Sequence, residues 1–242
     1  MKKIIIENIK TLFFALVIAI LIRSLLFQPF YIPSSSMEPN LLIGDRLFVS
    51  KYTYGYSKHS LPFSIKLFKN RILSRTPQAG DVIVFKTPAD NRTDYIKRLI
   101  GLPGDKIQII DNNLYINDEK VKKKKIINSI DINCGDEIIE VNFFQETLPN
   151  GAKYTSTYRR EGSMMNSDIY IVPNNHYFFM GDNRDCSKDS RFLSSVGYVN
   201  FNNLVGKAQI LFFSNDIKKG SIFKFWNLGN SLRIERFFKK IN

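Results

Sequence analysis

Residues 94–116 read DYIKRLIGLPGDKIQIIDNNLYI, and this stretch contains the pattern that decides the fold. Two short apolar runs, at 106–110 and 113–116, flank the pair Asp111-Asn112. Because aspartate and asparagine accept the backbone of a tight turn, the two runs predict a β-hairpin. Upstream, residues 94–101 ahead of the turn signal Leu102-Pro103-Gly104-Asp105 predict another strand.

The same pattern extends in both directions from this stretch. Glycine, proline, asparagine and aspartate separate further short apolar runs, and helical periodicity is scarce beyond the N-terminal segment. Many short strands with such turns between them predict a mainly β fold with an antiparallel-sheet core. The further runs are 46–50, 82–85, 169–172, 177–180 and 208–213.

Residues 117–168 are patterned more weakly, and we interpret them as a β-rich sub-domain inserted into that core. They contain the run Lys122–Lys125. Such a run is most simply a solvated loop, and a patch that binds membrane or nucleic acid is the alternative.

The N-terminal segment contains the longest apolar run. Leu12–Ile22 is uninterrupted, and a span from about Ile9 to Phe27 is long enough to cross a hydrocarbon core of ~30 Å. Lysines at positions 2, 3 and 10 precede it, so the positive-inside rule places this end in the cytoplasm and the rest of the chain outside. We expect one transmembrane signal anchor.

Two other interpretations of this segment stay open. A cleaved secretory signal has small residues at its cleavage site, whereas the bulky Phe27–Tyr31 follows the run here. A buried core helix is also compatible with the length of the uninterrupted run.

Composition excludes several classes of protein. The 242 residues include 35 Lys and Arg against 22 Asp and Glu, a formal charge of +13, and 44% are hydrophobic. This balance excludes a disordered chain and a polytopic membrane protein. Two cysteines are too few for a disulfide-stapled miniprotein or a zinc ribbon. The charge alone leaves nucleic acid, an anionic membrane and an acidic substrate as partners.

Residues 31–45, YIPSSSMEPNLLIGD, follow the anchor directly. Three consecutive serines usually form a linker, but Pro33 and Pro39 stiffen this one on both sides. A stiff serine turn beside a membrane is a candidate site for a nucleophile.

Lys97 lies in the alternating run 94–101, among apolar neighbours. If its face of the strand is buried, the lysine loses its charge and becomes a general base near neutral pH. The alternative is an ordinary surface lysine on an edge strand.

Residues 180–191, MGDNRDCSKDSR, form a polar loop after an apolar run. Its carboxylates and arginines can form a hydrogen-bonded network that fixes neighbouring groups. A calcium loop built on Asp182, Asp185 and Asp189 is a competing interpretation, although the spacing does not fit an EF-hand. A rigid structural loop is the third.

These segments occur together and in order, and with them the chain resembles the bacterial type I signal peptidases, membrane-bound serine proteases that remove signal peptides. The resemblance is carried by the anchor, by YIKRLIGLPGD at 95–105 and by GDNRDCSKDSR at 181–191. It lapses in the middle region. Three positions depart from the family pattern without replacing a reacting group: Ser35, Asn40 and Cys186.

The resemblance implies a role for each matching residue. Ser36 matches the nucleophile, Lys97 the general base, and Ser34 the hydroxyl that forms the oxyanion hole with the Ser36 N–H. Ser187 matches the serine that orients the lysine. The supporting ion-pair network is matched by Asp189, Arg191 and Arg98. No metal or other cofactor is implied.

The physical chemistry is compatible with these roles. A serine hydroxyl needs a base to become a nucleophile, and Ser–Lys pairs are known alternatives to Ser–His–Asp. The only histidines, His59 and His176, lie outside these motifs.

The resemblance also implies the substrate and the setting. Preproteins would bind by strand addition, with pockets for small side chains. Partners would be signal-peptide-bearing preproteins and the lipid bilayer, but no nucleic acid, and the protein would be a monomer in the bacterial cytoplasmic membrane with its catalytic domain outside. Candidate pocket residues are Ile32, Met37, Leu41, Tyr95 and Ile96, for which ordinary core is the other interpretation.

Residues 216–242 interleave basic residues with Phe223, Phe225, Trp226, Phe237 and Phe238, which favours either membrane contact or packing on the domain. Cys134 and Cys186 lie on the oxidising side of the membrane in this topology, so the sequence leaves a disulfide open.

The expected organisation follows from these boundaries: a cytoplasmic tail at 1–10, the anchor at 11–28, the catalytic core at 29–116 and 169–215 around the insert 117–168, and the tail 216–242.

Two other functions compete with the peptidase. One is a membrane-tethered β-rich binding module without catalysis. The other is a Ser–Lys self-cleaving peptidase like the SOS-response repressors, against which the anchor argues.

Overall fold

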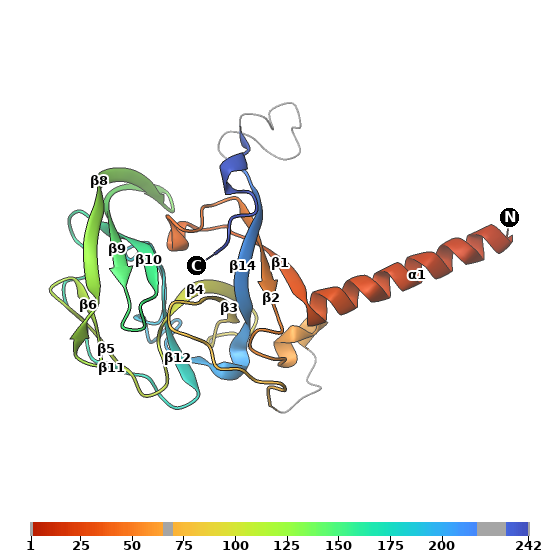
Figure 1. Cartoon of the computed structure of the whole chain (residues 1–242), viewed down its shortest axis with the longest axis horizontal. Helices are drawn as coiled ribbons and strands as arrows, with labels where there is room; N and C mark the ends of the chain where they lie inside the picture. The colour runs from red at the N-terminus through yellow and green to blue at the C-terminus, as the bar shows by residue number, and fades with distance from the viewer. Residues whose placement is uncertain (1, 65–69, 217–230, 242) are drawn as a thin grey trace.

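The computed structural model describes residues 2–64, 70–216 and 231–241. One helix, α1 (Lys2–Leu25), projects from a body made of antiparallel strands (Figure 1). Its segment Lys3–Leu25 is long and apolar enough to cross a membrane, with a mean hydropathy of 2.2, and its apolar window is not buried in the body. The helix is therefore consistent with membrane anchoring and does not fit the alternative of a buried core helix.

The anchor was predicted to extend to residue 28, but the helix ends at Leu25. Phe27 already pairs with Ser50 as the first residue of β1 (Phe27–Tyr31). Pro29 fits this strand because β1 is at the edge of its sheet, where a missing backbone donor is tolerated.

The largest sheet has seven strands and an antiparallel ladder throughout. It draws strands from both predicted parts of the catalytic core, 29–116 and 169–215, although residues 106–116 and 170–171 of those parts belong to a smaller sheet. Its order is β1, β2 (Asp45–Ser50), β14 (Leu204–Ser214), β3 (Val82–Lys86), β4 (Asp94–Gly101), β12 (His176–Met180) and β13 (Val199–Asn200).

Two smaller sheets lie on the side of the body away from α1 (Figure 1). The predicted hairpin is confirmed as β5 (Lys106–Ile110) and β6 (Asn113–Ile116), which pair with β11 (Tyr170–Ile171) and β7 (Glu119–Lys120). The other sheet is formed by β8 (Lys122–Cys134), β9 (Glu137–Thr147) and β10 (Lys153–Arg159).

The lysine run 122–125 is part of β8, so its interpretation as a loop is wrong. Strand alternation places Lys123 on the opposite face from its neighbours Lys122 and Lys124. Lys122, Lys124 and Lys125 are exposed, whereas Lys123 is partly buried and places its ammonium 3.5 Å from the centre of the Tyr158 ring.

The core lies on both faces of the large sheet. In β3, Val82 and Val84 pack with Leu47 and Val49 on one face, while Ile83 and Phe85 pack with Leu99 and Phe179 on the other. A strand covered on both faces is expected to be continuously apolar, which explains the run VIVF.

The described part of the tail packs on the body. Arg236, in a short 3-10 helix (Ile234–Arg236), donates to both carboxylate oxygens of Asp45, at 3.0 and 2.6 Å. The Phe237 ring packs against that of Phe213 in a tilted arrangement, with ring centroids 5.4 Å apart, while Phe238 is 72% exposed. Packing on the domain therefore holds for this part, and the predicted membrane contacts of Phe223, Phe225 and Trp226 lie outside the described residues.

Candidate active site

The serine turn is a buried 3-10 helix, Ser35–Met37. Met37, the last residue of this helix, and Leu41 anchor it to the core, since both are fully buried beside Leu47. The loop after β12 holds it from the side: the Asn183 N–H donates to the Ser36 carbonyl and its side-chain amide donates to the Ser35 carbonyl, each at 3.2 Å. The backbone of Ser36 is thus fixed from two directions.

Lys97 comes to this turn from β4, where it is the Cα partner of Ile83. Its ammonium nitrogen lies 2.6 Å from Ser36 Oγ, although the two residues are 61 positions apart in the chain. Lys97 is only 4% exposed. Burial lowers the pKa of Lys97 to about 8, against the opposing charges of Asp189 and Asp182.

Ser34 lies at the exposed rim of the site. Its hydroxyl is 3.3 Å from Ser36 Oγ. Ser34 is exposed, whereas Ser36 and Lys97 are buried.

Ser187 is buried beside the same pair. A Cβ added to Gly181 would collide with the Ser187 side chain and with the Ser36 carbonyl, so the three residues are in close contact. The Ser187 hydroxyl lies close enough to the Asp189 carboxylate to help lower the pKa of that group. Lys97 makes its hydrogen bond to Ser36.

Two buried ion pairs lie under the site. Arg191 donates to both carboxylate oxygens of Asp189, at 2.8 and 2.9 Å. Although burial raises the pKa of Asp189, the Arg191 guanidinium and its hydrogen bonds hold it below the usual value. Asp189 also accepts a hydrogen bond from the Gly181 N–H, and this contact orients the loop.

Arg98 forms the second pair, with Asp182, which was absent from the predicted support residues. The guanidinium donates to both oxygens of Asp182, at 2.7 and 2.8 Å, and to the Gly80 carbonyl. Asn40 donates to the same carboxylate at 2.7 Å.

A third charged cluster, which was not predicted from the sequence, connects the loop after β12 to the sheet of β8, β9 and β10. Arg184 donates to Glu146 at 2.7 Å, and both side chains are at most 2% exposed. Glu146 also accepts from the hydroxyls of Tyr154, Ser156 and Tyr158. Glu146 is in β9 and its partners come from β10 and the loop after β12, so no local sequence pattern marks the cluster.

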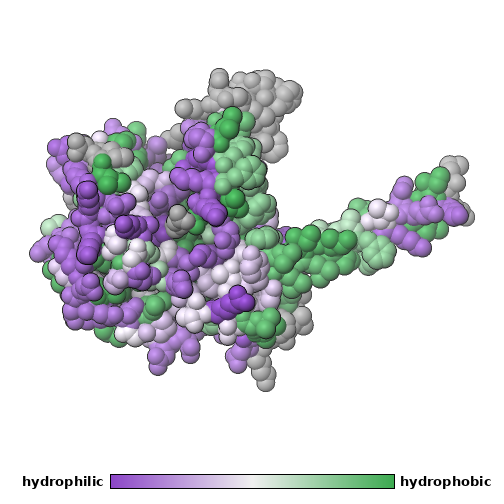
Figure 2. Space-filling model, viewed as in Figure 1, coloured by the Kyte–Doolittle hydropathy of each residue, from purple (hydrophilic) through white to green (hydrophobic). Residues whose placement is uncertain are grey.

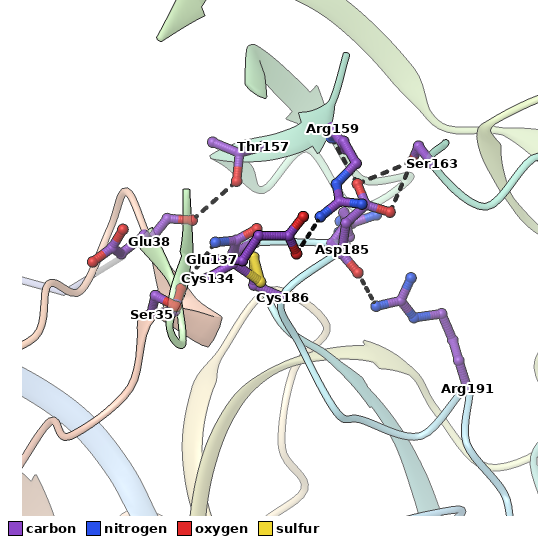
Figure 3. The surroundings of a disulfide bond; sticks show 12 residues. Ser35, Glu38, Cys134, Glu137, Thr157, Arg159, Ser163, Asp185, Cys186 and Arg191 are labelled. Carbon is purple, nitrogen blue, oxygen red and sulfur yellow. Dashed lines mark hydrogen bonds and ion pairs between the residues drawn. A yellow bond between two sulfur atoms is a disulfide. The ribbon is translucent and has the colours of Figure 1, made fainter. Parts of the chain in front are cut away.

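The calcium interpretation required three loop carboxylates around one point. Asp182 and Asp189 instead pair with separate arginines, and Asp185 accepts from the Arg159 N–H and from Ser163 (Figure 3). Within residues 2–64, 70–216 and 231–241 no group of three His, Cys, Asp or Glu is placed to hold a metal ion.

The two cysteines, whose pairing the sequence left open, form a disulfide (Figure 3). Cys134 ends β8 and Cys186 precedes Ser187, with their Cα atoms 5.4 Å apart. The bond therefore attaches the end of β8 to the loop that carries Ser187 and Asp189.

A cavity of about 400 Å³ opens over Ser36 and Lys97. Of the predicted pocket residues, Ile32, Tyr95 and Ile96 line it, whereas Met37 and Leu41 lie in the core beneath and do not. Further lining residues are Phe30, Tyr31, Pro33, Ser34, Val84, Thr93, Asp94, Cys186 and Lys188.

The chain matches known proteins over most of its length. The family described as "Signal peptidase, peptidase S26" matches residues 5–213. Signal peptidase I of Rickettsia typhi is 43% identical over 94% of this chain and 90% of its own, and that of Rickettsia conorii is 46% identical over 84% and 78%.

A solved structure, signal peptidase I of Enterococcus faecalis, is 26% identical and covers 55% of this chain and 97% of its own, with a TM-score of 0.32. The superposition is too loose to add to the assignment, which rests on the family match and on the two rickettsial relatives. The chain belongs to the signal peptidase family of serine endopeptidases, peptidase S26.

Proposed function

We propose that this protein cleaves signal peptides from exported preproteins with Ser36 as nucleophile and Lys97 as general base. The observation that carries the proposal is the buried hydrogen bond of 2.6 Å between Lys97 Nζ and Ser36 Oγ. With its pKa lowered to about 8, a substantial fraction of Lys97 is neutral in mildly alkaline solution. A neutral amine at this distance accepts the serine proton.

The reaction proceeds in two halves. Lys97 takes the Ser36 proton as Oγ attacks the scissile carbonyl, and the resulting ammonium then protonates the leaving amine of the mature protein. This leaves the signal peptide esterified to Ser36. Lys97 next deprotonates a water molecule that attacks the ester, which releases the signal peptide as a carboxylate and restores the serine.

The oxyanion of each tetrahedral intermediate is assigned to the Ser36 N–H and the Ser34 hydroxyl. Ser34 is exposed and its hydroxyl lies 3.3 Å from Ser36 Oγ, where a carbonyl oxygen of a bound peptide can reach it. Such donors contribute about 3–4 kcal/mol to transition-state stabilisation.

Ser187 is assigned to orient Lys97 when substrate is bound. It is buried, and Gly181 packs against both its side chain and the Ser36 carbonyl, so Ser187 lies close to the reacting pair. Asp189, Arg191 and Arg98 support the loop and the strand around it.

The substrate is assigned to a gap between two strand edges. β4 pairs with β12 only from Arg98 to Gly101, so Asp94–Lys97 have a ladder partner on the β3 side alone among the described strands. Opposite them, the segment after the edge strand β1 lines the same cavity. An extended peptide fits between these edges by strand addition, with Ile32, Tyr95 and Ile96 beside its side chains.

The membrane topology belongs to the proposal as well. α1 spans the cytoplasmic membrane once, with the lysines at positions 2, 3 and 10 inside and the body, as a monomer, outside. Externally added protease then digests the body in intact spheroplasts, whereas protection of residues 35–242 contradicts this orientation.

The experiment uses full-length protein in detergent with a signal-peptide-bearing preprotein. Wild type cleaves it, while Ser36→Ala and Lys97→Met do not. Ser35→Ala, the neighbouring serine, and Lys106→Met, a half-buried lysine paired with Asp118, keep the activity. Full activity in either dyad variant contradicts the mechanism, and a wild type that binds the preprotein without cleaving it favours the binding module.

A further inference from the structure

A second, polar cavity lies where α1 enters the body. The last turn of the helix is fixed there, because the Lys51 N–H donates to the Leu26 carbonyl at 2.9 Å and the Tyr56 hydroxyl donates to the Leu25 carbonyl at 3.0 Å. The neck residues Arg23, Ser24 and Gln28 therefore hold defined positions relative to the body.

This cavity has a volume of about 190 Å³ and, among the described residues, shares only Asp94 with the one over Ser36. Arg23, Ser24 and Gln28 form one wall, and the remaining lining comes from the segment 59–64, Lys86, Asp94 and Val205. Two lining side chains are more than nine-tenths buried and carry a polar atom without a partner: Ser24 Oγ and His59 Nε2. Since unpaired buried polar groups cost free energy, they indicate a missing ligand.

The electrostatics favour an anion at this position. The Arg23 guanidinium, at the cavity wall, makes no ion pair within the described part of the chain. Lys86 and Asp94 pair with each other at 2.9 Å and largely cancel. The buried Lys51 ammonium adds positive charge behind the cavity, where it donates to the His59 and Ser60 carbonyls.

His59 fits the same ligand as a neutral donor. Burial, reinforced by the surrounding lysines, lowers its pKa to about 4. Its Nδ1 lies 2.9 Å from the Ser64 hydroxyl. When Nδ1 accepts that hydroxyl, the ring hydrogen is on the unpartnered Nε2 and available to an oxygen in the cavity.

The cavity lies at the level of the lipid headgroups if α1 spans the bilayer, because Arg23 is in its last turn. An apolar cavity of about 440 Å³ shares Arg23 and is lined otherwise by Ala19, Ile22, Phe27, Pro29 and Phe48. Apolar surface covers the part of α1 next to the body (Figure 2). Polar and apolar sites that meet at one arginine suit an amphipathic ligand.

We propose that the polar cavity binds the phosphate of a membrane phospholipid. Arg23 pairs with the phosphate charge, Ser24 and His59 donate hydrogen bonds to its oxygens, and an acyl chain occupies the apolar cavity. A phosphodiester combines one negative charge with several acceptor oxygens, which are the groups that this set of donors satisfies. The site does not depend on the Ser36–Lys97 mechanism.

Native mass spectrometry of the full-length protein tests the proposal. Dioleoylphosphatidylglycerol is titrated into the detergent-solubilised protein, and dioleoylglycerol, which lacks the phosphate, is titrated in parallel. Wild type is expected to retain one phospholipid and no dioleoylglycerol. Arg23→Gln is expected to weaken retention about tenfold, in line with the loss of one charge-assisted contact. Arg160→Gln, which removes one positive charge just after β10, is expected to leave phospholipid retention unchanged.

His59→Phe is the second variant, because it keeps an aromatic ring at this position while removing both ring nitrogens, Nε2 among them, and it is also expected to weaken retention. Circular dichroism verifies that each variant is folded. One folded variant of the two is enough to test the proposal. Equal retention of dioleoylglycerol, or wild-type retention in a folded Arg23→Gln or His59→Phe, overturns the proposal. So does inorganic phosphate that binds the lipid-free protein and prevents phospholipid retention at millimolar concentration, because the site then takes a free anion.

Discussion

The Arg98 guanidinium and the Asp182 carboxylate form a two-point ion pair, at 2.7 and 2.8 Å, in which both side chains are only 1% exposed. Arg98 is the chain neighbour of Lys97, and Asp182 belongs to the loop that holds the Ser36 backbone through Asn183. The pair therefore connects the strand of the base to the support of the nucleophile.

Asp182→Asn is expected to destabilise the protein strongly. The change leaves the buried Arg98 charge without its counter-charge, which costs about 3–5 kcal/mol. Urea unfolding in detergent, followed by far-ultraviolet circular dichroism, measures the loss of stability. Asp118→Asn, which removes an exposed partner of Lys106, serves as the control and is expected to cost less than about 1 kcal/mol. Equal stability of the two variants contradicts this role of Asp182.

Gly181→Ala is expected to reduce turnover while the fold survives. The new methyl group meets the Ser187 side chain and the Ser36 carbonyl, so the reacting serine is displaced. A displacement of about 1 Å costs on the order of 100-fold in rate. Preprotein cleavage measures the loss.

Gly151→Ala provides the comparison for that variant. The added Cβ has no neighbour within 4 Å, but the residue has a left-handed φ of 85°. The expected effect is a stability loss of about 1 kcal/mol with normal turnover. If Gly181→Ala turns over as fast as Gly151→Ala, the close packing around Gly181 has no catalytic role.

Breaking the disulfide is expected to lower stability. Cys134 and Cys186 are separated by 52 positions, and a link of this length stabilises by about 2–4 kcal/mol through the unfolded chain. Unfolding midpoints with and without reductant measure the effect. A Cys134→Ser, Cys186→Ser double variant should match the reduced wild type and ignore reductant. An unchanged midpoint in wild type would show that the bond contributes nothing.

The strands were predictable where turn residues bound them closely. Lys106–Ile110 and Asn113–Ile116 have the expected limits because Asp111 and Asn112 both adopt positive φ angles in the turn between them. The strand at the lysine run 122–125 was not predicted, because pairing with β9 holds it and its own composition does not favour a strand. Tertiary context overrides local propensity in such a strand.

The site was predictable where a motif carries its own residue roles, and not where partners meet from distant elements. Ser36 and Lys97 come together as the motifs imply. The partner of Arg98, by contrast, is Asp182, 84 positions away, and nothing in either segment selects it over Asp189. Met37 and Leu41 illustrate a related limit, because apolar residues beside a nucleophile can line the pocket or support it from the core.

The pH dependence of kcat/KM for preprotein cleavage tests the central claim, that Lys97 is the base for Ser36, most directly. Only neutral Lys97 accepts the proton, so with its pKa lowered to about 8 the rate rises about tenfold per pH unit below that value and levels off above it. The result predicted is a single ascending limb with an apparent pKa of about 8. A rate that keeps rising to the ordinary lysine value of 10.5, or one that does not vary over this range, would contradict the account.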